Sequence, residues 1–149
     1  MAKLVKSDIE KIIPHRFPFL LIDEILEVEP GVSIKGVKYV NEDEYYFKGH
    51  FPGNPIMPGV LQVETIAQAG AVSVLMLPEN KKKLILFAGI DKARFKRMVK
   101  PGDELMIEVE MEGFRRNIGK GKGRATVEGD LSCAVEIMFA LGDNPQAGS

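Results

Sequence analysis

The sequence predicts an α+β fold in which an antiparallel β-sheet wraps around one long α-helix. The first observation is that residues 60–77 contain a single ionisable side chain, Glu64, so a helix here is apolar on nearly every face and needs burial all round. The second is that the rest of the chain divides into about five to seven short strand-like segments. A curved antiparallel sheet would bury such a helix, and the side left open would suit a second copy of the chain.

The composition is typical of one soluble globular domain. The chain has 149 residues, of which 45% are hydrophobic and 28% charged. We expect the domain to cover residues 1–142 and residues 143–149 to form a flexible tail. The net charge of -1 gives no general attraction to nucleic acid or to an anionic membrane. Polar side chains such as Gln62 and Gln68 argue against insertion of the long helix into a membrane.

A single cysteine, Cys133, excludes an intrachain disulfide and a zinc site built from several cysteines. One free thiol fits a reducing compartment. Charges at Asp8, Glu10 and Lys11 interrupt the apolar stretch that a signal peptide would need. We therefore expect a cytoplasmic protein.

The segments before the centre of the chain predict a helix, two strands and a polar turn, over residues 8–13, 17–29, 33–40 and 41–47. Ser7 and Glu10 have the spacing of a capping box, and Pro14 ends the short helix. We expect the polar turn to pass into extended chain.

The segments after the long helix predict two strands, a basic turn or strand rich in glycine, and a last strand or two, over residues 84–95, 105–114, 115–123 and 124–141. The clearest pattern lies in residues 105–114, where apolar residues alternate with mainly acidic ones. Because the connections are short, we expect these strands to be antiparallel neighbours.

A rigid loop precedes the long helix. Residues 49–60 read GHFPGNPIMPGV and contain three prolines and three glycines. Each proline fixes a φ angle, so the loop can hold His50 in place with little further loss of entropy. Pro58 and Gly59 begin the helix, whose first N–H groups have no partner within the helix and can bind the oxygen of a polarised carbonyl group.

Glu64 lies about 7.5 Å along the helix axis from Gly59 and shares a face with Gln68. Burial among apolar side chains should raise the pKa of its carboxyl group, which suits a group that exchanges a proton near neutral pH. His50 adds an imidazole, and together these groups make a complete acid–base site for chemistry next to a carbonyl. No metal site is indicated, because the two histidines lie 35 positions apart.

Three blocks of the sequence resemble one family, the β-hydroxyacyl-[acyl-carrier-protein] dehydratases of type II fatty acid synthesis, FabZ type. The active-site signature is similar to GHFPGNPIMPGVLQVETIAQ, the N-terminal segment to IIPHRFPFLLIDEILEVEPG, and the strand and turn after the helix to FAGIDKARFKRMVKPGDEL. Glu64 favours the FabZ type, because the sister dehydratase/isomerase type has Asp there. The resemblance implies a hot-dog fold and dimers with a continuous sheet, commonly three to a hexamer.

The resemblance also implies roles for individual residues. His50 matches the catalytic histidine and Glu64 the catalytic carboxylate, and in this family the two groups of one site come from different subunits. Gly59 matches the backbone N–H donor to the thioester carbonyl. Gln68 matches a helper beside the carboxylate.

The implied reaction is the dehydration of a (3R)-3-hydroxyacyl chain held as a thioester on an acyl carrier protein. His50 would remove a proton from C2, and either Glu64 or the His50 imidazolium would protonate the departing C3 hydroxyl. The resemblance implies no cofactor, because the thioester already activates C2. Ile56 and Phe87 are candidate substrate-binding residues, with Phe87 lining an apolar tunnel for the acyl chain.

Four basic side chains lie close together in residues 91–97, DKARFKR: Lys92, Arg94, Lys96 and Arg97. We expect the first three to share one strand face, where they would attract an acidic carrier protein. The alternative is an ordinary solvated face. His15 and Arg16 also match family positions, and we expect them to pack against the loop.

Three alternatives are compatible with these residues. A hot-dog acyl thioesterase shares the fold and a helix carboxylate but hydrolyses the thioester. An enoyl-CoA hydratase runs the same chemistry backwards on coenzyme A esters. A non-catalytic module would only bind acyl thioesters. The loop histidine followed fourteen residues later by Glu64 favours dehydration, and the presence of both groups argues against a mere binder.

Overall fold

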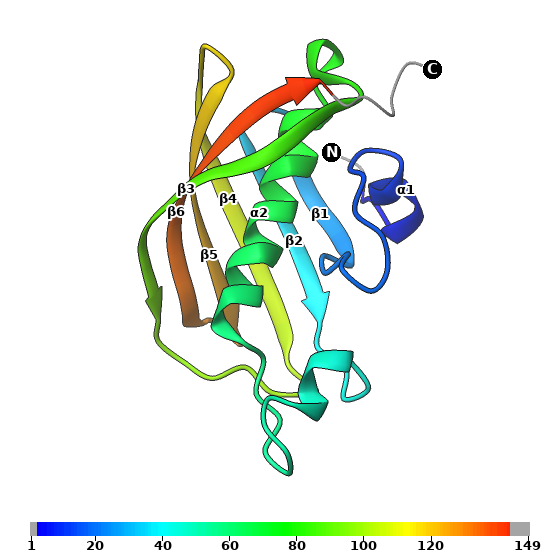
Figure 1. The fold of residues 1–149 in the computed structure, drawn as a ribbon, viewed down its shortest axis with the longest axis vertical. Coiled ribbons are helices and arrows are strands. Elements are labelled where there is room, and N and C mark those ends of the chain that lie inside the picture. Colours follow the sequence, from blue (N-terminus) through cyan, green and yellow to red (C-terminus); the bar gives the residue numbers. More distant parts are fainter. Residues whose placement is uncertain (1–2, 144–149) are drawn as a thin grey trace.

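The computed structural model describes residues 3–143, which form a six-stranded antiparallel sheet curved around a long helix (Figure 1). The strand order across the sheet is β1-β2-β4-β5-β6-β3. The helices are α1 (Lys6–Glu10), α2 (Gly59–Leu75) and the short 3-10 helices η1 (Tyr45–Lys48) and η2 (Pro78–Asn80). The strands are β1 (Glu24–Glu29), β2 (Ser33–Tyr39), β3 (Lys83–Phe95), β4 (Glu104–Arg115), β5 (Ile118–Val127) and β6 (Asp130–Asp143). The predicted hot-dog architecture is confirmed.

Helix α2 is the centre of the core. Every residue from Thr65 to Leu75 is buried, as an almost uncharged helix requires. Strand β4 packs Leu105, Ile107 and Val109 against it from alternate positions, which confirms the alternation read from the sequence. No helix within residues 3–143 is long and apolar enough to cross a membrane.

The glycine-rich basic segment is a hairpin turn followed by the regular strand β5. Arg116 and Asn117 both have positive φ, as the two-residue hairpin turns that match strand twist require. The glycines of β5 point inward and its lysines outward. A Cβ on Gly123 would overlap Cγ2 of Ile66, so glycine lets this strand approach α2 closely.

The expectation that the strands after α2 are all neighbours is wrong for β3 and β4. Strand β3 pairs with β6 at the edge of the sheet, while β4 lies between β2 and β5. The connection over residues 96–103 runs past the end of the sheet instead of turning back. The Lys96 N–H donates to Ser132 O at 2.8 Å, and the Met57 N–H donates to Val99 O at 2.8 Å, which holds this connection beside the start of α2.

The N-terminal segment differs from the prediction in two respects. Helix α1 begins at Lys6, with the Val5 N–H donating to Asp8 Oδ2 at 3.0 Å, so Ser7 is not its cap. The strand predicted from residue 17 begins only at Glu24. The N–H groups of residues 21 and 22 bind a side chain of α2, which keeps this stretch out of the ladder.

The structure of residues 45–48 and the end of the last strand also differ from the prediction. Residues 45–48 form the 3-10 helix η1 instead of extended chain, because Tyr46 and Phe47 are buried. Strand β6 continues to Asp143, the first residue of the predicted tail. The rest of that tail, residues 144–149, lies outside the described residues.

Candidate active site

The loop over residues 49–58 fixes the orientation of His50. Its Nδ1 lies 2.7 Å from Ile56 O, and because a carbonyl can only accept, Nδ1 carries the proton. The Ile56 N–H in turn donates to His50 O at 3.0 Å, and the ring stacks on Phe51 with centroids 4.0 Å apart. Nε2 is therefore left with its lone pair, as a general base needs.

Gly59 begins α2 with an N–H group that makes no hydrogen bond to any of residues 3–143. The N–H groups of Leu61 and Gln62, by contrast, both donate to Pro58 O. A Cβ on Gly59 would lie 2.7 Å from the Phe95 ring. Glycine is therefore required by the close approach of that ring, which covers one side of the helix start.

Glu64 is mostly buried, and burial raises the pKa of its carboxyl group. The Gln68 Nε2 donates to its Oε2 at 2.9 Å, which lowers the pKa by a smaller amount. His15 Nε2 lies 3.7 Å from the same oxygen. Burial, and then the charge of Arg16, lower the pKa of His15, so it is neutral at neutral pH and does not pull the Glu64 pKa down.

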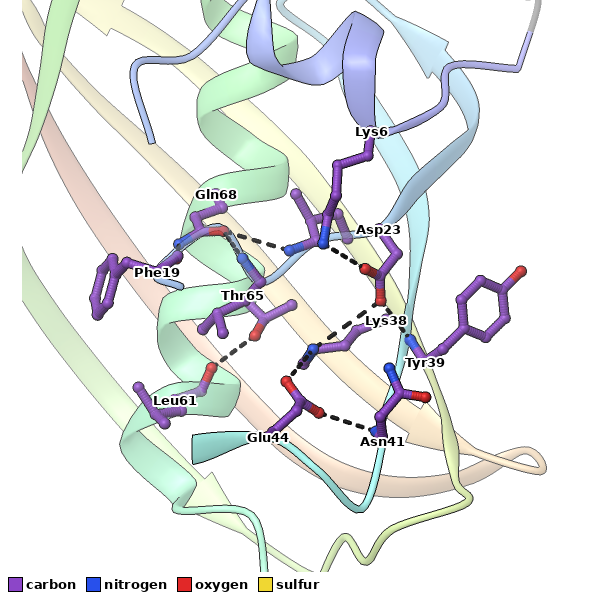
Figure 2. A network of polar contacts seen from close by, with 12 residues as sticks. Lys6, Phe19, Asp23, Lys38, Tyr39, Asn41, Glu44, Leu61, Thr65 and Gln68 are labelled. Carbon is purple, nitrogen blue, oxygen red and sulfur yellow. Dashed lines mark hydrogen bonds and ion pairs between the residues drawn. The ribbon is translucent and has the colours of Figure 1, made fainter. Parts of the chain in front are cut away.

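Gln68 is 1% exposed and uses both ends of its amide. Its Oε1 accepts from the N–H groups of Leu21 at 2.7 Å and Ile22 at 3.3 Å. Its Nε2 donates to Phe19 O at 2.8 Å as well as to Glu64 (Figure 2 shows Gln68 beside Phe19). Because backbone groups fix the amide, a donor necessarily faces the carboxylate.

A cavity of 210 Å³ lies between α2 and β3 and includes Glu64 in its wall. It is lined by His15, Phe19, Glu64, Ala67, Gln68, Ala71, Ile85, Leu86, Phe87 and Phe139. The rings of Phe87 and Phe139 stack with centroids 6.1 Å apart. An apolar cavity with a protonatable group at its wall can hold an acyl chain. No group of three or more potential metal ligands lies together within residues 3–143.

The structure separates the predicted site residues into two sets. Glu64, Gln68 and Phe87 line the cavity, whereas His50 and Gly59 do not. Ile56 holds His50 through its carbonyl group. In a single chain the loop histidine and the helix carboxylate thus belong to different surroundings.

The expectation that Lys92, Arg94 and Lys96 share one strand face holds for the first two, which line the same trough, and is wrong for Lys96. The register of β3 shifts just before Arg94, and Lys92 has a positive φ of 51°, so the alternation is interrupted. Lys96 lies beyond the end of β3. Lys92 and Arg94 line a trough of 690 Å³ on the sheet, while Arg97 Nη1 pairs with Asp130 Oδ2 at 2.9 Å.

The sequence did not predict that His15, which was expected to pack against the loop, lies beside Glu64, nor that Lys38 is buried. His15 lies in the cavity wall beside Glu64, and its being one of only two histidines was the available signal. Lys38 is 3% exposed. Its position, two residues after Gly36 and four after Ile34, places it on the same buried face of β2 as these two residues. The alternation of side chains along a strand could therefore have revealed its burial.

Comparisons with known proteins agree with the geometry. A family model described as a FabA-like domain matches residues 13–136. The chain is 60% identical over 137 residues to the 3-hydroxyacyl-[acyl-carrier-protein] dehydratase FabZ of Chloroflexus aggregans (strain MD-66 / DSM 9485), an alignment that covers 92% of this chain and 95% of that protein. It is 58% identical over 137 residues to the protein of the same name from Anoxybacillus flavithermus (strain DSM 21510 / WK1), covering 92% and 96%.

A solved structure, the dehydratase heterocomplex ApeI:P from Xenorhabdus doucetiae, superposes with a TM-score of 0.77 at 18% identity and covers 92% of this chain and 91% of that one. At this identity the likeness supports the fold alone. The family match and the high identity to its members give the assignment: the chain belongs to the FabA-like family and, within it, to the FabZ-type 3-hydroxyacyl-[acyl-carrier-protein] dehydratases.

Proposed function

We propose that the chain dehydrates (3R)-3-hydroxyacyl-[acyl-carrier-protein] to trans-2-enoyl-[acyl-carrier-protein] in type II fatty acid synthesis. The observation that carries the proposal is Glu64, whose carboxyl group lies in the wall of an apolar cavity with a raised pKa and a fixed hydrogen bond from Gln68. The relatives at about 60% identity that bear this enzyme's name support it.

His50 acts as the base. Its Nε2 takes a proton from C2 of the substrate, and the electron pair of that C–H bond becomes the C2–C3 double bond. The hydrogen bond from Nδ1 to Ile56 O stabilises the imidazolium that forms, because the donor is then charged. The N–H of Gly59 stabilises the negative charge that develops on the thioester oxygen.

Glu64 acts as the acid. The C3–O bond breaks as the protonated carboxyl group gives its proton to the departing hydroxyl, and water is released. The raised pKa favours the protonated form that this step needs. Transfer of the C2 proton from His50 back to Glu64 restores the starting state.

The active unit is a dimer, with three dimers forming a hexamer. The outer edge of β3 is free within residues 3–143 and carries exposed apolar side chains: Leu86, Ile90 and Phe95. Such an edge pairs readily with the same strand of a second copy. This assembly would bring His50 of one subunit to the cavity that holds Glu64 of the other.

The acyl chain arrives on an acidic acyl carrier protein in the cytoplasm. We assign its docking to Lys92, Arg94, Lys96 and Arg97. Arg94 and Lys96 support this best, because neither forms an ion pair with any of residues 3–143. Free cations near an entrance raise the rate of encounter with an acidic partner.

The test is the hydration of a crotonyl thioester, followed as loss of its enoyl absorbance, in the wild type, His50→Ala and Glu64→Ala. Loss of a general acid or base costs about 10²-fold or more. Glu79→Ala serves as the control, because this exposed glutamate lies beyond the far end of α2. We expect activity in the wild type and the control and its collapse in both site variants.

Other outcomes would change the assignment. Loss of absorbance together with release of free thiol would identify a thioesterase. Saturable binding of the thioester without turnover would leave a binding module. Faster turnover of a coenzyme A ester than of a carrier-protein ester would favour a hydratase.

A further inference from the structure

Lys38 is the one charged side chain within residues 3–143 that is fully buried, at 3% exposure. Its Nζ lies 2.7 Å from Glu44 Oε1 and 4.0 Å from Asp23 Oδ2. Burying a charge is unfavourable unless it is paired, and apolar residues of similar size often stabilise a fold as well or better. Stability alone therefore does not explain why a lysine is buried between two carboxylates.

On one side, Lys38 holds the segment that leads into the His50 loop. Glu44 Oε2 accepts from the Asn41 N–H at 3.0 Å, and Glu44 O accepts from the Phe47 N–H at 3.1 Å. Glu44 is the residue that precedes the first turn of η1. The residue after η1 is Gly49, and His50 follows it directly. The ion pair between Lys38 and Glu44 thus fixes the start of a short segment, residues 44–50, that ends at His50.

On the other side, Lys38 faces the segment that fixes Gln68. Asp23 Oδ2 accepts from the Tyr39 N–H at 2.7 Å, and Asp23 Oδ1 pairs with Lys6 Nζ at 2.7 Å. Asp23 follows residues 21–22 directly, whose N–H groups bind the Gln68 side chain. Figure 2 shows the two groups of contacts side by side, with Asp23 close to both.

We propose that Lys38 is a positioning residue that fixes the position of the His50 loop relative to the segment that holds Gln68 and Glu64. This rests on the proposed function, since it assigns His50 and Glu64 to the reaction. Lys38 touches neither substrate nor reacting atoms and acts through Glu44 and Asp23. Without its charge, the two carboxylates would repel each other and the 41–49 segment would shift.

The experiment compares Lys38→Met with the double variant Lys38→Met/Glu44→Gln. The single variant leaves the Glu44 carboxylate buried without its cation, and the double variant removes that charge. The amide oxygen of the introduced glutamine can still accept from the Asn41 N–H. Lys6→Met is the matched control, because it removes a cation from the same Asp23 at a site where the lysine side chain is 44% exposed. For each protein we would measure thermal unfolding, kcat and KM with crotonyl thioester, and the imidazole NMR signals.

The chain offers a clean spectroscopic reading, because His15 and His50 are its only histidines. We expect the double variant to recover the stability lost in the single one but not its activity. In both, kcat should fall about tenfold or more with KM changed less than about twofold, since small displacements of a reacting group have large effects on rate. The His50 signal should move, and the control should match the wild type in kcat and in that signal.

A double variant that folds with wild-type kcat overturns the proposal, as does recovery of kcat together with stability. A fall in kcat with an unchanged His50 signal overturns it too, because the effect would not pass through the loop. If the single variant does not fold, kcat and the His50 signal of the double variant alone test the proposal. Should the wild type be inactive, the proposed function fails, and the His50 signal alone then tests the positioning role.

Discussion

Two opposing effects act on the carboxyl group of Glu64. Burial raises its pKa, and the Gln68 amide donates a hydrogen bond that lowers it by less. The nearest basic group, His15, is kept neutral by its own burial. Because no cation within residues 3–143 offsets the loss of hydration, the site holds the proton more tightly than an exposed carboxyl group does. Under the proposed function, the apolar surroundings that would bind the acyl chain also raise the pKa of the Glu64 carboxyl group.

This arrangement makes the stability of the fold depend on pH through Glu64. In the unfolded chain the carboxyl titrates near its ordinary pKa of 4.5, and the folded state binds the proton more tightly. Stability from this group is therefore complete below 4.5 and falls as the pH rises through the folded pKa. We expect Glu64→Gln to raise the melting temperature relative to wild type at pH 8 and to change it much less at pH 4.

Thermal unfolding at both values of pH checks this, with Glu79→Gln as the control for an exposed glutamate. A difference between Glu64→Gln and wild type that does not change with pH would contradict it. Activity should be lost in the same variant, because an amide has no acidic proton to give.

At the scale of elements, the distance between β5 and α2 depends on which inward residues lack a side chain. Gly121 and Gly123 occupy successive inward positions of β5. At Gly123 the nearest atom is a methyl of Ile66, which is itself 0% exposed and has no room to move. At Gly121 it is the sulfur of Met111, at the end of a flexible side chain. The same substitution should therefore have different effects at the two positions.

We expect Gly123→Ala to destabilise the fold by about 1–3 kcal/mol, as is typical of overpacking in a core. Gly121→Ala should be clearly milder, since Met111 can shift to make room. Chemical denaturation of the two variants against wild type measures the difference. Equal losses at both positions would show that backbone flexibility, and not contact with α2, determines the cost.

At the scale of the whole molecule, one chain does not place the proposed base His50 in the cavity wall that holds the proposed acid Glu64. A dimer across the free edge of β3 would provide two complete sites, each with a histidine from one subunit and a carboxylate from the other.

Mixing two inactive variants tests this arrangement. If each site takes its groups from both subunits, dimers of one His50→Ala chain and one Glu64→Ala chain contain one intact site and one doubly altered site. After unfolding and refolding an equal mixture, we expect about a quarter of the wild-type activity, because about half of the dimers are mixed and each has one intact site. Each variant refolded alone is the control. Activity no higher than in the controls would place both groups of a site on one subunit.

The local features of this protein were determined by the sequence itself. The buried helix follows from an eighteen-residue stretch whose single ionisable side chain is Glu64, and the rigid loop around His50 follows from its prolines. The alternation of β4 was also readable, because side-chain direction in a strand depends only on position along the chain. The same holds for the raised pKa of Glu64, which needs only apolar neighbours.

Other features were decided by contacts between distant parts of the chain. Residues 21–22 left the predicted strand because Gln68, 46 or more positions away, takes their N–H groups. The place of β3 at the sheet edge depends on the path of the connection over residues 96–103. The neutral His15 beside Glu64 and the buried charge of Lys38 likewise exist only once separate segments meet. Contacts and charge pairs between distant segments depend on the whole fold, and for that reason only the tertiary structure could assign them.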